Sequence, residues 1–250
     1  MKKTTLLLFS FLLIAGNVFS ANNGWINIMD MGARNDGKTL CTDVIHDAIN
    51  RAGREGGGTI YFPAGEFLTG AIVLKSNITL HLDAGATIKF SDNFDHYLPF
   101  VVVRWEGTVM KSFCPLIYAY EQENITITGR GKLDGQGKAW WTEMYKHMVE
   151  IRDNGDIKNL NKYQKMWEDQ NKGLETSDYY ENTMKLRFFR PPFIQVFKCK
   201  NFRMEGVTVV NSPFWTINPI FTDNITIAGV TISNPPSPNT DGINPSSCSN

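Results

Sequence analysis

The sequence predicts an all-β fold, a parallel β-helix, because one short phrase returns at a constant interval. An Asn, an alternating strand and a Gly occur at Asn201–Gly206 (NFRMEG) and again 23 residues later at Asn224–Gly229 (NITIAG). The same phrase opens at Asn77 and at Asn124, which stand 47 residues apart, close to twice that interval. A constant interval places each unit over the same part of its neighbour, so that strands of successive coils pair in parallel.

The recurring Asn is expected to stack as a ladder at a bend of the coil, because Asn and Gly tolerate the left-handed backbone of such turns. Its predicted role is structural. Asn250 stands at the same place in the frame, 26 residues after Asn224, so we expect a further coil to begin there.

Residues 1–20 are predicted to be a signal peptide. A positive start at 1–3 (MKK) precedes an apolar run at 6–15 that is too short to span a bilayer. Residues 18–20 (VFS) fit a cleavage site. We therefore expect export to the periplasm or the medium, no membrane contact after cleavage, and one β-helix domain over residues 21–250. An uncleaved membrane anchor is the alternative.

Residues 25–62 are predicted to form a cap at the N-terminal end. We expect a helix that Thr42 caps and that ends at Gly53 and the glycines 56–58. Its apolar positions fall on one face: Val44, Ile45, Ala48, Ile49 and Ala52. An amphipathic helix laid over the first coil would shield that coil from water. His46, in the same helix, is expected at the surface.

After Gly58 the apolar residues change to a period of two. Short strands are predicted at 59–62, 71–74, 78–82 and 86–90, separated by turn residues. Short strands at this spacing are also compatible with a β-sandwich. The repeated Asn-Ile-Thr phrase favours the solenoid.

Two segments interrupt the repeat. Residues 91–111 are aromatic and read as irregular, and residues 138–185 are long, polar and rich in helix formers. The second segment is predicted to leave the coil as a helical excursion. Such excursions often form the wall of a binding groove, although a solvated insertion without ligand contact fits equally well.

Composition excludes some partners. The chain carries 25 Lys and Arg against 25 Asp and Glu, so no basic field points to nucleic acid or to an anionic membrane surface. The four Cys lack the spacing of metal ligands and are too few for a disulfide scaffold: Cys41, Cys114, Cys199 and Cys248. We expect buried thiols, no metal and no cofactor.

One motif, Asn239-Thr240-Asp241-Gly242, is by itself an ordinary turn signal. It gains meaning from other motifs that stand in order around it: Gly129-x-Gly131-x-x-Asp134-Gly135-x-Gly137, Trp140-Trp141, Arg190-Pro191, Asn211–Ile217 (NSPFWTI) and Ser247-Cys248-x-Asn250. In this order, and over essentially all of residues 21–250, the chain resembles the polygalacturonase family of glycoside hydrolases, family 28.

The resemblance implies a right-handed parallel β-helix that hydrolyses α-1,4-linked galacturonic acid in pectin, with inversion and without a metal. Asp241 matches one of the family's catalytic aspartates, on the side that activates water, and Asn239 is expected to bind substrate. An inverting reaction needs a protonated carboxyl and, roughly 6.5–9.5 Å away, a carboxylate that activates water. The expected partner is a polysaccharide (pectin, polygalacturonate or their oligosaccharides), and the expected state is a monomer.

The family pattern also contains a Gly-Asp-Asp, a Gly-His-Gly and an Arg-x-Lys, which should lie beyond Asn250. They would supply the general acid, a second base and the cationic pair that holds the substrate carboxylate. We therefore expect the 250-residue chain by itself to be inactive. A smaller departure is Asn218, where many relatives carry His.

Two alternative functions remain open at this stage. A pectate lyase would use Ca²⁺ on the same fold, but the sequence has no cluster of acidic ligands. A β-helix that binds pectin without cleaving it is the second alternative.

Four further residues have structural interpretations. Arg187 and Arg190 could bind substrate carboxylates or serve structure alone, and Phe214 and Trp215 read as core or wall residues.

Overall fold

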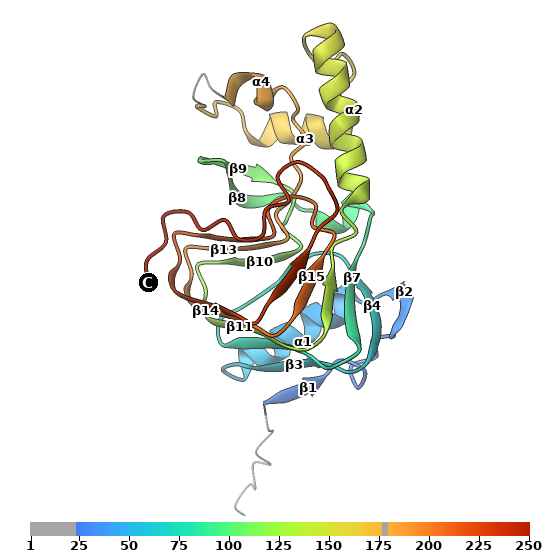
Figure 1. Cartoon of the computed structure of the whole chain (residues 1–250), viewed down its shortest axis with the longest axis vertical. Coiled ribbons are helices and arrows are strands. Elements are labelled where there is room, and N and C mark those ends of the chain that lie inside the picture. The colour runs from blue at the N-terminus through green and yellow to red at the C-terminus, as the bar shows by residue number, and fades with distance from the viewer. Residues whose placement is uncertain (1–23, 177–179) are drawn as a thin grey trace, which may run out of the picture.

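The structure, a computed structural model, describes residues 24–176 and 180–250 and forms a parallel β-helix (Figure 1). The right-handed parallel β-helix expected from the sequence is confirmed. The predicted signal peptide, residues 1–20, lies outside the described residues. Within the described part, no helix is long and apolar enough to cross a membrane.

Three sheets run along the solenoid, and neighbouring strands in each are parallel. Sheet 1 contains β1 (Trp25–Asn27), β3 (Gly58–Phe62), β6 (Ile78–Leu82), β11 (Glu123–Gly129), β14 (Lys200–Glu205) and β17 (Asp223–Ala228). Sheet 2 contains β5 (Ile72–Val73), β10 (Ile117–Tyr120), β13 (Ile194–Phe197) and β16 (Ile217–Ile220). Sheet 3 contains β2 (Asp36–Leu40), β4 (Gly65–Thr69), β7 (Ala86–Phe90), β12 (Lys132–Asp134), β15 (Thr208–Val210) and β18 (Thr231–Ser233).

The core is a set of apolar columns that follow from the constant register. One column in sheet 1 pairs Ile60, Leu80, Ile127, Met204 and Ile227 on five successive strands. The first four side chains are fully buried, and Ile227 on the last strand is half-buried. Each coil therefore buries its apolar side chains against the coils on either side of it.

The predicted Asn ladder is confirmed at the turn that leads into sheet 1. Asn124 Nδ2 donates to Asn77 Oδ1 at 2.7 Å, and Asn201 donates to Asn124 at 2.7 Å. Asn224 donates to Asn201 at 2.8 Å. All four residues have φ between 56 and 62°, the left-handed region that Asn tolerates. The ladder is structural, as expected.

The predicted cap is the helix α1 (Thr42–Arg54), which buries Ile45, Ala48, Ile49 and Ala52. The expectation that Thr42 caps it is wrong, since the N-cap is Cys41 and no side chain bonds the helix end. The Thr42 hydroxyl instead accepts a hydrogen bond from the backbone N–H of Gly70 at 2.7 Å. This bond joins the helix to the next coil.

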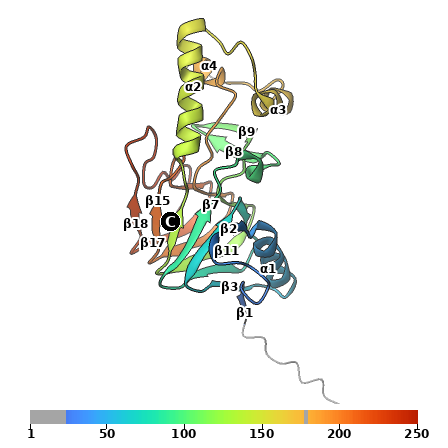
Figure 2. The same ribbon diagram turned by 90° about the vertical axis from the view of Figure 1, so that its right-hand side faces the viewer.

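The helical excursion is confirmed as α2 (Lys138–Asn154), α3 (Lys162–Gln170) and α4 (Glu181–Met184). Figure 2 shows α2 rising away from the stacked coils. Arg187 ties the excursion together through Asp156, at 2.7 Å, and Glu168, at 2.6 Å. These ion pairs support the structural reading of Arg187.

The reading of residues 91–111 as irregular is wrong. After a short 3-10 helix at Phe94–Tyr97, the strands β8 (Val101–Trp105) and β9 (Thr108–Ser112) form an antiparallel hairpin. Glu106 and Gly107 turn it, both with positive φ. The hairpin stands on the outer side of sheet 2 (Figure 1).

We predict that Asn201→Ala lowers the free energy of unfolding by about 2–3 kcal/mol. It removes two ladder hydrogen bonds and leaves a residue with a Cβ and no local polar group in the left-handed region. Asn201→Gly should cost only about 1 kcal/mol, because Gly accepts that backbone freely. Urea unfolding followed by circular dichroism measures both. Equal losses would contradict the backbone argument.

A second prediction concerns coil spacing. Gly129 has φ +114°, and a Cβ there would lie 1.9 Å from the carbonyl oxygen of Leu82 on the preceding coil. Gly129→Ala should destabilise the fold by about 4 kcal/mol or abolish folding. Gly155→Ala is the matched control, since Gly155 has φ +80° and nothing within 4 Å of the added Cβ. Its expected cost is about 1 kcal/mol, and similar losses for the two variants in thermal unfolding would refute the steric explanation.

Candidate functional site

Arg190 connects three successive coils at the edge of sheet 2. It precedes β13 and is buried, with 6% of its surface exposed. Its Nη1 donates to the carbonyl oxygens of Pro213 and Pro238, each at 2.9 Å, and its Nη2 donates to Asn239 Oδ1 at 3.1 Å. One guanidinium therefore holds the loop that carries the Asn-Thr-Asp-Gly motif against the loop of the coil before it.

Arg190 keeps its positive charge inside the protein although burial disfavours that charge. Burial lowers the pKa of its guanidinium to about 10, so it stays protonated at neutral pH. The guanidinium also lies 5.0 Å from the centre of the Phe214 ring. Because both Nη1 protons and one Nη2 proton are used by protein oxygens, these contacts favour the structural reading of Arg190.

Asn234 supports the same motif from the coil before it. Its Oδ1 accepts a bond from Ser212 N at 2.9 Å, and its Nδ2 donates to Thr216 Oγ1 at 2.9 Å and to Thr240 O at 2.8 Å. Asn234 immediately precedes the loop Pro235–Pro238, and its side chain bonds both the preceding coil and the motif.

Asp241 opens the rung of sheet 2 that follows β16. Its carbonyl oxygen accepts a bond from Thr216 N at 2.9 Å, and the next rung pairs at Ile217 and Ile243. The carboxylate is exposed, and its Oδ2 accepts a bond from Asn244 Nδ2 at 3.1 Å. Asn239, also exposed, uses its Oδ1 for Arg190. The two predicted site residues therefore lie on one loop, with their side chains bonded to different partners.

The hairpin β8–β9 docks on the outer face of sheet 2 through side-chain amides. The buried Gln195 accepts from Arg104 N at 3.4 Å and donates to Arg104 O at 3.1 Å, so it pairs with the strand edge as another strand would. Tyr118 donates its hydroxyl proton to the carbonyl oxygen of Val102. Gln195 also donates to Asn218 Oδ1 at 2.7 Å, and Asn218 donates to the carbonyl of Asn244 at 2.7 Å.

A groove of about 670 Å³ lies between the hairpin turn and the last coil. We call it the hairpin groove; it is lined by Arg104, Glu106, Gly107, Tyr180, Trp215, Ile220, Ile243, Asn244, Pro245 and Ser246. Trp215 is half-buried and stacks on Phe214 with ring centres 4.8 Å apart. Arg104 bonds Ser246 and lies over the Phe221 ring at 5.1 Å. An aromatic wall beside polar side chains suits a sugar ring.

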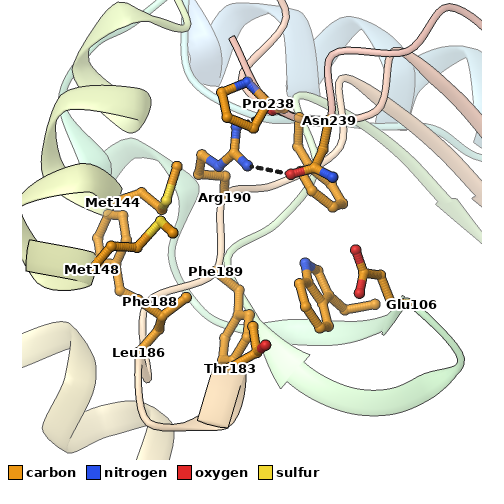
Figure 3. Close-up of a pocket in the computed structure, with 12 residues that line it drawn as sticks. Glu106, Met144, Met148, Thr183, Leu186, Phe188, Phe189, Arg190, Pro238 and Asn239 are labelled. Atoms are coloured by element: carbon orange, nitrogen blue, oxygen red, sulfur yellow. Dashed lines mark hydrogen bonds between the residues drawn. The ribbon is translucent and has the colours of Figure 1, made fainter. Parts of the chain in front are cut away.

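A second cavity, of about 210 Å³, adjoins the first (Figure 3). We call it the apolar pocket; it is lined by Trp105, Glu106, Met144, Met148, Thr183, Leu186, Phe188, Phe189, Arg190, Phe214, Pro238 and Asn239. Figure 3 shows Met144 and Met148 entering it from α2, with Glu106 on the opposite side. Burial raises the pKa of Glu106, and the positive charge of Arg190 offsets part of that rise.

Sequence reasoning missed the hairpin turn that carries Glu106. The signal was present, because two runs that contain β-branched residues, 101–105 (VVVRW) and 108–112 (TVMKS), are separated by Glu106-Gly107, a two-residue connection with Gly in second place. The contribution of Met144 and Met148 had no comparable signal, since their roles depend on where α2 stands. Among residues 24–176 and 180–250, no three His, Cys, Asp or Glu side chains gather as a metal site would require.

Two family models match separate parts of the chain. Residues 25–110 match the model described as rhamnogalacturonase A/epimerase, pectate lyase-like. Residues 175–250 match glycosyl hydrolases family 28. The second match contains the loop held by Arg190 and the rung that Asp241 opens.

Individual relatives agree with these models. A protein named probable polygalacturonase from Vitis vinifera is 31% identical over 90% of this chain and 40% of its own length. The exopolygalacturonase of Thermotoga maritima is 37% identical, with a TM-score of 0.71 over 90% of this chain and 50% of its own. A polygalacturonase from Erwinia carotovora gives 26% identity and a TM-score of 0.60 over 86% and 51%. The chain thus spans half or less of the length of the first two of these relatives. On its motifs, its coil architecture and these matches, the chain belongs to family 28 of the glycosyl hydrolases.

Proposed function

We propose that the protein containing this chain hydrolyses α-1,4-galacturonosyl linkages in pectin or polygalacturonate with inversion, and that Asp241 is a base that activates water. The observation that carries the proposal is the position of Asp241. Its carboxylate is exposed at the start of a new rung and is bonded by the neutral amide of Asn244, and Asn244 itself lines the hairpin groove, which has an aromatic wall. A carboxylate that accepts a single bond from a neutral donor keeps lone pairs free to accept a bond from a water molecule.

The proposed reaction divides the work between two carboxyl groups. One protonated carboxyl donates to the leaving glycosidic oxygen, while Asp241 accepts a proton from water that attacks the opposite face of the anomeric carbon. Residues beyond Asn250 would supply the acid. Rungs stacked at strand spacing can bring carboxyls close enough to raise one another's pKa and keep one protonated. Asn239 would position the sugar. Arg190 fixes the side chain by bonding its Oδ1, and the Nδ2 of the same amide would donate a hydrogen bond to the sugar.

We further propose that the protein is exported after loss of residues 1–20 and acts as a monomer on a polysaccharide. The substrate class follows the names of the relatives, which include exopolygalacturonases from Zea mays and Thermotoga maritima.

The catalytic proposal predicts that Asp241→Asn lowers kcat at least about 1,000-fold while the fold is retained, because the amide cannot accept the proton from water. Reducing ends released from polygalacturonate measure the rate. Asp47→Asn is the control, because Asp47 is an exposed carboxylate on α1, outside the site. It should keep the activity of the starting protein.

The assay should use the longest reading frame that contains this chain, together with the 250-residue chain. We expect activity in a form that carries the Gly-Asp-Asp motif and none in the 250-residue chain. Activity that survives Asp241→Asn, or an unsaturated product absorbing in the ultraviolet, would exclude the proposed hydrolysis. Pectin binding without cleavage by the longest form would favour the non-catalytic alternative.

We propose that cleavage starts from a chain end. The hairpin β8–β9 occupies the outer face of sheet 2 over β10 and β13, through Tyr118 and Gln195. These rungs precede the rung of Asp241, so a long polysaccharide lying along the sheet can extend in only one direction from that residue.

End-on cleavage predicts a product pattern. Reducing ends should rise while the viscosity of a polygalacturonate solution falls little, and the first products should be short. The measurement is a plot of viscosity against released ends, with an internally cleaving polygalacturonase as reference. An early, steep loss of viscosity would show internal cleavage and would mean that the hairpin does not close the groove.

A further inference from the structure

We propose that the apolar pocket is a subsite for the methyl ester of an esterified uronate, so that the protein prefers methyl-esterified pectin next to the bond it cleaves. This inference rests on the proposed function for the identity of the sugar. It names a substrate feature that the function by itself leaves open.

The lining of the pocket is apolar where a guest would be deepest. Met144, Phe188 and Phe189 are buried and present a thioether and two aromatic rings. Met148, 47% exposed, stands at the side open to solvent. Thioether and aromatic surfaces gain free energy from contact with a methyl group and give no hydrogen bonds to a carboxylate.

The polar groups of the pocket do not suit a second anion. Three of the five N–H protons of Arg190 bond protein oxygens, both on Nη1 and one on Nη2, so its Nη1–Nη2 edge is already occupied. Glu106 adds a carboxyl to the opposite wall. A free uronate carboxylate in this space would lose its water and face another acidic group, whereas its methyl ester would carry no charge to desolvate.

The position of the pocket connects it to the candidate site. Asn239 lines the pocket and stands two residues before Asp241 on the same loop. Glu106 lines both the pocket and the hairpin groove. A sugar in the groove can therefore place its C6 substituent past Glu106 into the pocket. The helical excursion supplies one wall of this subsite through α2 and α4.

The test compares the binding of two trisaccharides, trigalacturonate and its trimethyl ester, by calorimetric titration of the full chain. We expect the ester to bind about tenfold more tightly than the acid. Met148→Lys should reduce that ratio to about one or reverse it, because Glu106 offsets the charge of Arg190 in the present pocket and a second cation would attract the free carboxylate. Met148→Glu should keep or increase the preference for the ester. Val149→Lys is the matched control, since Val149 is 46% exposed on the same helix and does not line the pocket.

A direct readout is the resonance of ¹³C-labelled methionine methyl groups. Those of Met144 and Met148 should shift on addition of the ester and much less with the acid. Equal binding of ester and acid, binding of neither, or the same ratio in Met148→Lys and Val149→Lys overturns the proposal. The proposed function is tested separately, by the release of reducing ends from unesterified polygalacturonate. Failure of the ester-subsite proposal therefore does not affect the test of hydrolysis, and the reverse also holds.

Discussion

The parallel pairing of successive coils is the constraint on which the rest of the structure depends. Each strand finds its backbone partners only on the coils before and after it, so every coil must repeat the same register. That register stacks apolar side chains into columns and places the four ladder asparagines within hydrogen-bonding distance. Where coils approach most closely, as at Gly129 and Leu82, no side chain fits.

Function is built where the chain departs from the repeat. The hairpin β8–β9 and the excursion α2–α4 leave the coil between rungs, and both return to the edge of sheet 2 near Arg190. Arg190 carries a buried charge there, and its cost of desolvation is offset by carbonyl and amide oxygens from two following coils. Holding those loops fixes the backbone of Asn239 and Asp241. A structural cation thus determines the position of the candidate acid–base residue.

The two cavities lie next to the loop of Asp241 without being lined by Asp241 itself: Asn239 lines the apolar pocket, and Asn244, which bonds Asp241, lines the hairpin groove. Glu106 borders both, so the hairpin turn separates a groove with a half-buried Trp215 from a pocket lined by methionine and phenylalanine. The two linings differ, because the groove offers polar side chains beside Trp215 whereas the pocket offers mainly apolar side chains. Two amide side chains, Gln195 and Asn218, then link the docked hairpin to the backbone carbonyl of Asn244, the residue whose side chain bonds Asp241.

The sequence by itself determined the solenoid, the cap, the excursion and the family, because these depend on periodicity and on motif order. Strands 78–82 and 86–90 were predicted with their observed bounds, and the Asn ladder followed from one interval. The hairpin was missed although its turn signal was present, and β4 (Gly65–Thr69) was not predicted. Only the tertiary structure decided that Arg190 clamps the motif, that Thr42 bonds the next coil, and that Met144 and Met148 meet Glu106 across a pocket. The physical reason is that a repeat encodes contacts between like positions on neighbouring coils, whereas these contacts join segments outside the repeat, whose approach depends on how the excursions pack.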